Sequence, residues 1–147
     1  MSKTPSVPRS AMWLGLSGLI PFAGLAMLVW LLPEERGWLS PVLTGYGVVI
    51  LSFMGGCRWG LAAAGMGDGA AFRPLAVSVI PALYAWVVAL MPDAQAQMFL
   101  AVGLIALLVA DLRLTRFGGA PTWWPSLRWP LSIGAAGSLL AGAAAIA

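Results

Sequence analysis

The chain has 147 residues, of which 61% are hydrophobic and only 9% are charged. Soluble globular domains carry about 45 to 50% apolar and about 25% charged residues, so this composition excludes an ordinary water-soluble domain and favours a polytopic α-helical membrane protein. The net charge of +3 comes from basic residues scattered singly rather than in a run, which argues against a nucleic-acid partner.

Five apolar segments are each long enough to cross a bilayer, because the hydrocarbon core requires about 20 residues of α-helix. We expect an all-α membrane protein in which five transmembrane helices form one bundle and one integral membrane domain over residues 1–147. The predicted helices cover about residues 11–32, 41–64, 74–91, 94–113 and 126–146. Pro33 is expected to end the first helix, and Pro41 to stand in the first turn of the second.

The basic residues mark one side of the predicted membrane. Seven of the eight lie on the side of the N-terminus, and one lies on the other side: Lys3, Arg9, Arg58, Arg73, Arg113, Arg116 and Arg128 against Arg36. Short cytoplasmic loops carry the excess of Lys and Arg in membrane proteins. We therefore expect a cytoplasmic N-terminus, a periplasmic C-terminus and a location in the bacterial inner membrane, in contact with its lipids.

Pro21 and Pro81 lie inside the first and the third predicted helix. Each removes a backbone donor and crowds the preceding turn, which predicts a kink. Kinked helices can enclose a cavity, and Tyr46, Tyr84 and Trp86 are candidates to line it or to contact a ligand. Packing of these aromatic side chains against the core or the lipid is the alternative.

Arg58 is the most unusual residue, since it lies roughly 9 Å before the cytoplasmic end of its predicted helix. A charge buried in a membrane is costly unless it has a partner. Asp111 lies at a similar depth in a helix that runs in the same direction, so we expect an intramembrane ion pair or a shared hydrogen-bond network. The alternatives are that each side chain reaches the head groups independently, or that the two handle a ligand or a proton.

Small residues recur at a spacing of four on two predicted helices. They are Ser52, Gly56, Gly60 and Ala64 on the second helix, and Gly134, Ser138 and Gly142 on the fifth. In lipid, such stripes let helices approach closely, and Gly56 with Gly60 forms the GxxxG pattern. We expect both stripes to pack within the chain, with contact to a partner protein or a second copy as the alternative.

The longest connection covers residues 117–128 and places Trp123 and Trp124 between two prolines. This segment is too rigid and aromatic for an ordinary linker, and tryptophan is enriched at membrane interfaces. We expect it to lie along the membrane surface, as an anchor or as a contact for lipid or another protein.

No residue pattern indicates catalysis. The chain has no His, which removes the usual ligand of haem and zinc and the usual proton shuttle. Glu34 and Glu35 are adjacent, so their carboxylates do not converge as an acid and base pair would, and the single Cys57 allows no internal disulfide. We expect no enzymatic activity, no metal and no cofactor.

Three segments carry a resemblance to known proteins: residues 14–22 (LGLSGLIPF), residues 46–60 with the block LSFMGGCRWG, and residues 78–81 (SVIP). They resemble the transmembrane-protein-69-like family, small multi-span proteins of bacteria and mitochondria that contain a domain of unknown function. The resemblance implies a membrane setting, and it supplies no activity or site residue.

These features favour a non-enzymatic accessory, assembly or scaffold protein that associates with other membrane-protein subunits or with itself. The alternative function is to bind or carry a small hydrophobic molecule in a cavity between the kinked helices. An enclosed cavity of about 300 Å³ or more, with converging polar groups or bound density, would favour that alternative.

Overall fold

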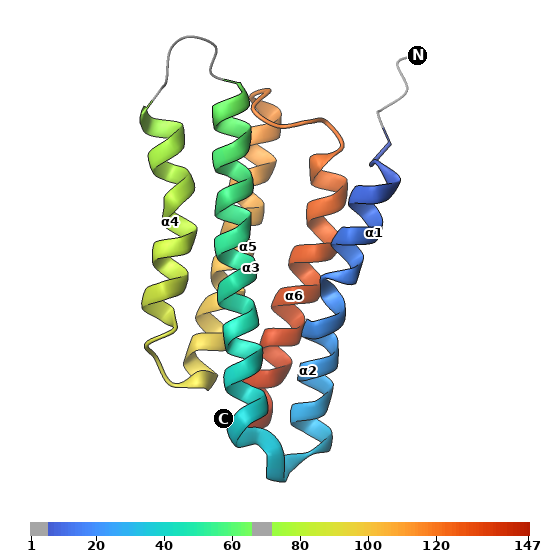
Figure 1. Ribbon diagram of the computed structural model, residues 1–147, viewed down its shortest axis with the longest axis vertical. Coiled ribbons are helices and arrows are strands. Elements are labelled where there is room, and N and C mark those ends of the chain that lie inside the picture. Colours follow the sequence, from blue (N-terminus) through green and yellow to red (C-terminus); the bar gives the residue numbers. More distant parts are fainter. Residues whose placement is uncertain (1–5, 66–71) are drawn as a thin grey trace.

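The computed structural model describes residues 6–65 and 72–147, and the regular secondary structure of these two ranges is entirely helical. In chain order the elements are α1 (Arg9–Ser17), α2 (Leu19–Leu31), the 3₁₀ turn η1 (Pro33–Glu35), α3 (Arg36–Ala64), α4 (Phe72–Val88), α5 (Asp93–Arg116) and α6 (Trp124–Ile146). They lie side by side along one axis, with α1 and α2 following each other end to end (Figure 1). Lys3, one of the basic residues named above, lies outside the described residues.

The helices alternate in direction. In Figure 1, α3 and α5 run one way, whereas α4, α6 and the α1–α2 pair run the other way. The beginning of α1 and the end of α6 therefore lie at opposite ends of the bundle.

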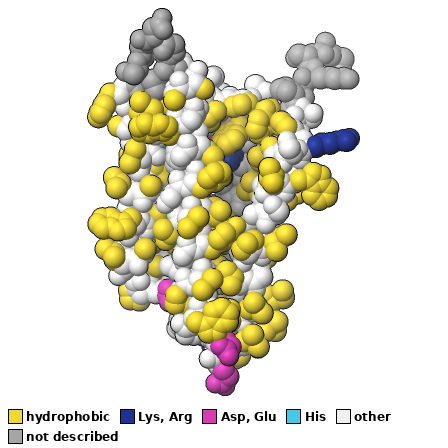
Figure 2. Space-filling view, in the orientation of Figure 1, with side chains coloured by type: hydrophobic (Ala, Val, Ile, Leu, Met, Phe, Trp, Pro, Cys, Tyr) yellow, Lys and Arg dark blue, Asp and Glu magenta, His cyan; other side chains and the backbone are white. Residues whose placement is uncertain are grey.

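Four helical stretches are long and apolar enough to cross a membrane: Arg9–Leu31, Pro33–Ala64, Asp93–Arg116 and Trp124–Ile146. The remaining helix, α4, is also apolar but has only 17 residues. Hydrophobic side chains cover most of the face seen in Figure 2, and Trp13, Phe72 and Leu90 are more than 70% exposed. Exposing so much apolar surface to water is unfavourable, whereas contact with lipid chains is not. The fold is that of an all-helical membrane protein.

The core lies where α3, α5 and α6 meet. Leu43, Leu100 and Leu139 are fully buried there, one from each of these helices. Gly47 of α3 allows this packing, since a Cβ atom at that position would lie 3.0 Å from Leu100 and 3.2 Å from Leu139. The longest helices therefore form a fixed centre against which α2 and α4 pack.

The first predicted helix, residues 11–32, is divided in two at Gly18. The break lies just before Pro21, which cannot donate to the Ser17 carbonyl and whose ring crowds the turn before it. The Tyr46 hydroxyl of α3 donates to the Gly18 carbonyl at 2.8 Å. This bond fixes the position of the break against α3.

The second predicted helix begins earlier than expected. It starts at Arg36, directly after η1, so Pro41 is the sixth residue of α3 and not part of its first turn. Pro41 has no N–H, so one carbonyl in the first turn of α3 lacks its usual intrahelical partner. Leu39 and Ser40, which precede Pro41, are buried, and this burial stabilises the helical turn before the proline. The other predicted ends differ from the structure by up to three residues.

Candidate functional site

Asp111 of α5 is the centre of a buried charged cluster. Its side chain is only 2% exposed, and its two carboxylate oxygens accept hydrogen bonds from two arginines on two other helices. Arg58 Nη1 of α3 donates to Oδ1 at 2.6 Å, and Arg128 Nε of α6 donates to Oδ2 at 2.9 Å. Trp124 Nε1 of α6 also points at Oδ2, at a distance of 3.3 Å. We call these four residues the Asp111 cluster.

Helical periodicity positions the cluster. Asp111 follows Leu104, Leu107 and Leu108 on the buried face of α5, at spacings of seven, four and three residues. Trp124 and Arg128 are four residues apart on α6, so their side chains lie one above the other on one face. Packing of α5 against α6 and α3 then carries Asp111 to the two guanidinium groups.

The structure thus brings Arg58 and Asp111 together instead of leaving each to reach the head groups alone. It also buries Arg128, whose side chain is 3% exposed and which was expected only among the interfacial basic residues. One signal was present in the sequence: Arg128 stands inside an apolar helix that contains no acidic residue. A charge in such a place requires a counter-charge from another helix.

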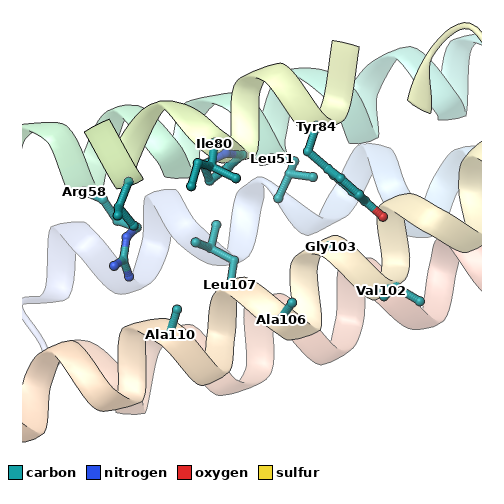
Figure 3. Close-up of a pocket in the computed structure, with 11 residues that line it drawn as sticks. Leu51, Arg58, Ile80, Tyr84, Val102, Gly103, Ala106, Leu107 and Ala110 are labelled. Atoms are coloured by element: carbon teal, nitrogen blue, oxygen red, sulfur yellow. The ribbon is translucent and has the colours of Figure 1, made fainter. Parts of the chain in front are cut away.

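An apolar groove of about 280 Å³ begins at Arg58 and runs between α3, α4 and α5. In Figure 3, Arg58 stands at one end of the groove and Tyr84 at the other, with Leu107 and Ala106 of α5 between them. The Tyr84 hydroxyl donates to the Phe99 carbonyl at 2.8 Å. Gly103 makes room for this ring, because a Cβ atom there would lie 2.7 Å from Tyr84.

The other aromatic candidates lie elsewhere. Tyr46 packs edge-on against Phe22, with ring centroids 4.7 Å apart, and does not line the groove. Trp86 is 62% exposed and does not line the groove, which leaves lipid contact, the alternative given above, as its place in the described structure. Trp123 packs edge-on against Trp124, which connects the aromatic segment after α5 to the Asp111 cluster.

The two small-residue stripes differ in their surroundings. Gly134 and Gly142 of α6 face Leu19 and Gln97 of other helices, and Ser138 between them donates to the Gly134 carbonyl. Gly56 and Gly60 instead are exposed, and a Cβ atom at either position would have no atom of another residue within 4 Å. Internal packing of these two glycines is therefore a wrong expectation for the described chain.

The close contact of α3 with α4 is made instead by Gly55, the residue before Gly56. A Cβ atom on Gly55 would lie 2.7 Å from the Ser78 carbonyl and 3.3 Å from Pro81. Helix α4 continues through Pro81, whose buried ring packs against this glycine. Of the other two residues of this stripe, Ser52 is partly buried and Ala64 is exposed at the end of α3.

A second polar cluster, missed in the sequence, lies toward the other end of the bundle. The fully buried Gln97 amide of α5 donates to the Ser40 hydroxyl at 2.9 Å and to the Thr44 hydroxyl at 3.2 Å. Thr44 in turn donates to Asp93 at 2.9 Å. These bonds fix α3 and α5 in register, and the residues line none of the hollows described for this structure.

Within residues 6–65 and 72–147, no group of three or more Cys, Asp or Glu residues is placed to hold a metal ion. The Asp111 cluster itself offers two guanidinium groups, one carboxylate and an indole N–H beside an apolar groove.

Residues 7–144 match a family described as "protein of unknown function (DUF3429)". The chain is 35% identical to transmembrane protein 69 of Xenopus tropicalis over 143 residues, covering 90% of this chain and 53% of that protein. It is 30% identical to transmembrane protein 69 of Mus musculus over 127 residues, covering 82% of this chain and 50% of that protein. The chain thus spans about half the length of these relatives, and no solved structure matches it. With a family match over nearly its whole length, the chain belongs to the transmembrane-protein-69-like (DUF3429) family.

Proposed function

We propose that this protein is a non-enzymatic integral membrane protein that binds a small hydrophobic molecule in the groove between α3, α4 and α5. The observation that carries the proposal is the groove itself: about 280 Å³ of space, lined almost entirely by apolar side chains and ending at the Arg58 guanidinium. This volume is close to the lower limit of ordinary ligand sites, which begin at about 300 Å³.

The chemistry of the groove supports a ligand with an apolar body and one polar end. Leu51, Ile80 and Leu107 supply apolar contacts, while Arg58 supplies N–H donors at the end next to Asp111. Tyr84 uses its hydroxyl proton within the protein, so the opposite end of the groove offers mainly an aromatic face. One charged group on an apolar wall is the usual composition of a site that orients a hydrophobic ligand.

The groove can be tested by filling it. Ala106 is small and lines the groove from α5, whereas its neighbour Ile105 does not line it. We expect a photoactivatable hydrophobic probe to label the α4 and α5 residues of the groove, and we expect Ala106→Trp to abolish this labelling. Ile105→Trp is the matched control and should leave it unchanged. Equal labelling in both variants would contradict the proposal.

A second function, that of an accessory, assembly or scaffold subunit, is supported by the outward-facing glycines of α3. Gly56 and Gly60 are open to close approach by another membrane helix, from a partner protein or a second copy. Gly45 is an equally open glycine on the same helix and serves as a control. Leu substitutions at Gly56 and Gly60 should remove a co-purifying protein or a dimer that Gly45→Leu retains; a monodisperse wild-type monomer without any partner would count against this function.

The proposed setting is the bacterial inner membrane, with the N-terminus in the cytoplasm. Arg9, Arg113 and Arg116 lie at the end of the bundle where α1 begins, while the single Arg36 lies at the other end. This distribution supports the orientation by the positive-inside rule.

A further inference from the structure

A second, smaller hollow of about 110 Å³ lies between α1, α2, α3, α5 and α6, and it shares no residue with the groove. Its walls are apolar except for two side chains of α6, Arg128 and Ser132. Phe53, which is 61% exposed, forms part of its rim, so the hollow opens toward the outer surface of α3. Figure 2 shows one basic side chain recessed among the hydrophobic side chains of the face drawn there.

Both polar side chains of the hollow are buried and have an atom without a hydrogen-bond partner. Arg128 donates from Nε to Asp111 and from Nη1 to the weak acceptor Met54 Sδ at 2.6 Å, while Nη2 has no partner. Ser132 is 1% exposed, and its Oγ has no partner either. The two residues are four positions apart on one helix, which places them on the same face. Two neighbouring residues that line one cavity therefore each keep a buried polar atom without a hydrogen-bond partner.

The net charge of the Asp111 cluster also favours an anion in this hollow. Its two arginines share one carboxylate, so among the described residues the cluster carries one positive charge in excess. The Arg58 side chain is 12% exposed and lines the groove, whereas the Arg128 side chain is 3% exposed and lines this hollow. A buried cation that is only half neutralised favours an additional anion.

We propose that this hollow binds the anionic oxygen of an amphiphile, a carboxylate or phosphate group that accepts from Arg128 Nη2 and from the Ser132 hydroxyl. The volume is several times the roughly 30 Å³ that one water occupies in the liquid, which is enough for the charged group but not for a whole lipid. The apolar part of the ligand leaves past Phe53 toward the lipid. This site is independent of the groove, so either can fail without the other.

Laurate and dodecanol test the proposal, because they share a chain and differ in charge. Their binding to the purified protein in neutral detergent is measured by native mass spectrometry, with inorganic phosphate as a third probe. We expect laurate to bind more tightly than dodecanol, and Ser132→Ala to weaken laurate about tenfold, which is typical of losing one hydrogen bond to a charged group. Dodecanol binding should be unchanged.

Ser138→Ala is the matched control. Ser138 lies on the same helix, but its hydroxyl donates to the Gly134 carbonyl at 2.9 Å and it does not line the hollow. The same laurate affinity in both variants would overturn the proposal, and so would an equal loss of laurate and dodecanol in Ser132→Ala. If phosphate competes with laurate and binds more weakly to Ser132→Ala, the oxyanion site is supported and also accepts a soluble anion. If phosphate binds and laurate does not, the proposal that the ligand is an amphiphile is overturned.

Discussion

Asp111 is a single carboxylate between two guanidinium groups, those of the partly buried Arg58 and the buried Arg128. Both of its oxygens are used by arginines from other helices, so it connects α3, α5 and α6 at once. Removing one partner of a buried ion pair costs about 3 to 5 kcal/mol, because the remaining charge stays in an apolar environment. The two arginines differ in burial, since the Arg58 side chain is 12% exposed and the Arg128 side chain only 3%.

We therefore predict that Asp111→Asn lowers the free energy of unfolding by about 3 to 5 kcal/mol, and that Arg58→Gln has a smaller effect. Unfolding in mixed micelles with increasing SDS measures both, and the exposed Glu34→Gln is a control that should change little. Exchanging the two charges, Arg58→Asp with Asp111→Arg, should not restore stability, because Arg128 would then face a second guanidinium group. Full restoration would contradict the role given to Arg128.

At the scale of the elements, the pattern of apolar length predicted where the helices lie but not which of their faces meet. Length and hydropathy are local properties, so each of the predicted segments coincides with a helical stretch of the structure to within a few residues, apart from the earlier start at Arg36. The inward face depends on the neighbours, which is a property of the whole bundle. Gly55 and Gly56 are adjacent, yet only Gly55 faces α4. The GxxxG spacing predicted internal packing for Gly56 and not for Gly55.

The two adjacent glycines give a direct prediction. Gly55→Ala should destabilise the protein by about 1 to 3 kcal/mol, because the new methyl group would collide with the backbone carbonyl of Ser78 and separate α3 from α4. Gly56→Ala should be neutral or stabilise by up to about 1 kcal/mol, because alanine is the better helix former and no atom lies near it. Thermal unfolding in detergent measures both variants, and equal effects would show that α4 does not pack on α3 through Gly55.

At the scale of the whole molecule, two polar clusters lie toward opposite ends of an apolar core. The Asp111 cluster and the Gln97 cluster both join α3 to α5, so these two helices are fixed in direction and register at two heights. Arg58 and Asp111 could be paired from the sequence, because their depths match and their helices run the same way. Arg128, Gln97 and Ser132 could not, because a single polar residue in an apolar segment does not reveal its partner until the helices are placed.

The parallel arrangement of α3 and α5 has a consequence for topology. Both helices belong to stretches long enough to cross the membrane, and both run from the end of the bundle that holds η1 to the end where α1 begins. We predict that helix α4 carries the chain back between them, although its 17 residues give only about 25 Å of helix against a hydrocarbon core of about 30 Å. We predict five crossings and termini on opposite sides of the membrane.

Fusions to reporter proteins test this topology. A C-terminal alkaline phosphatase fusion should be active and a C-terminal green fluorescent protein fusion dark, with the opposite result for fusions in the 117–123 connection. Cytoplasmic signals from both positions would mean that the chain between 117 and the C-terminus does not cross, and a cytoplasmic C-terminus together with a periplasmic 117–123 connection would mean that α4 does not return.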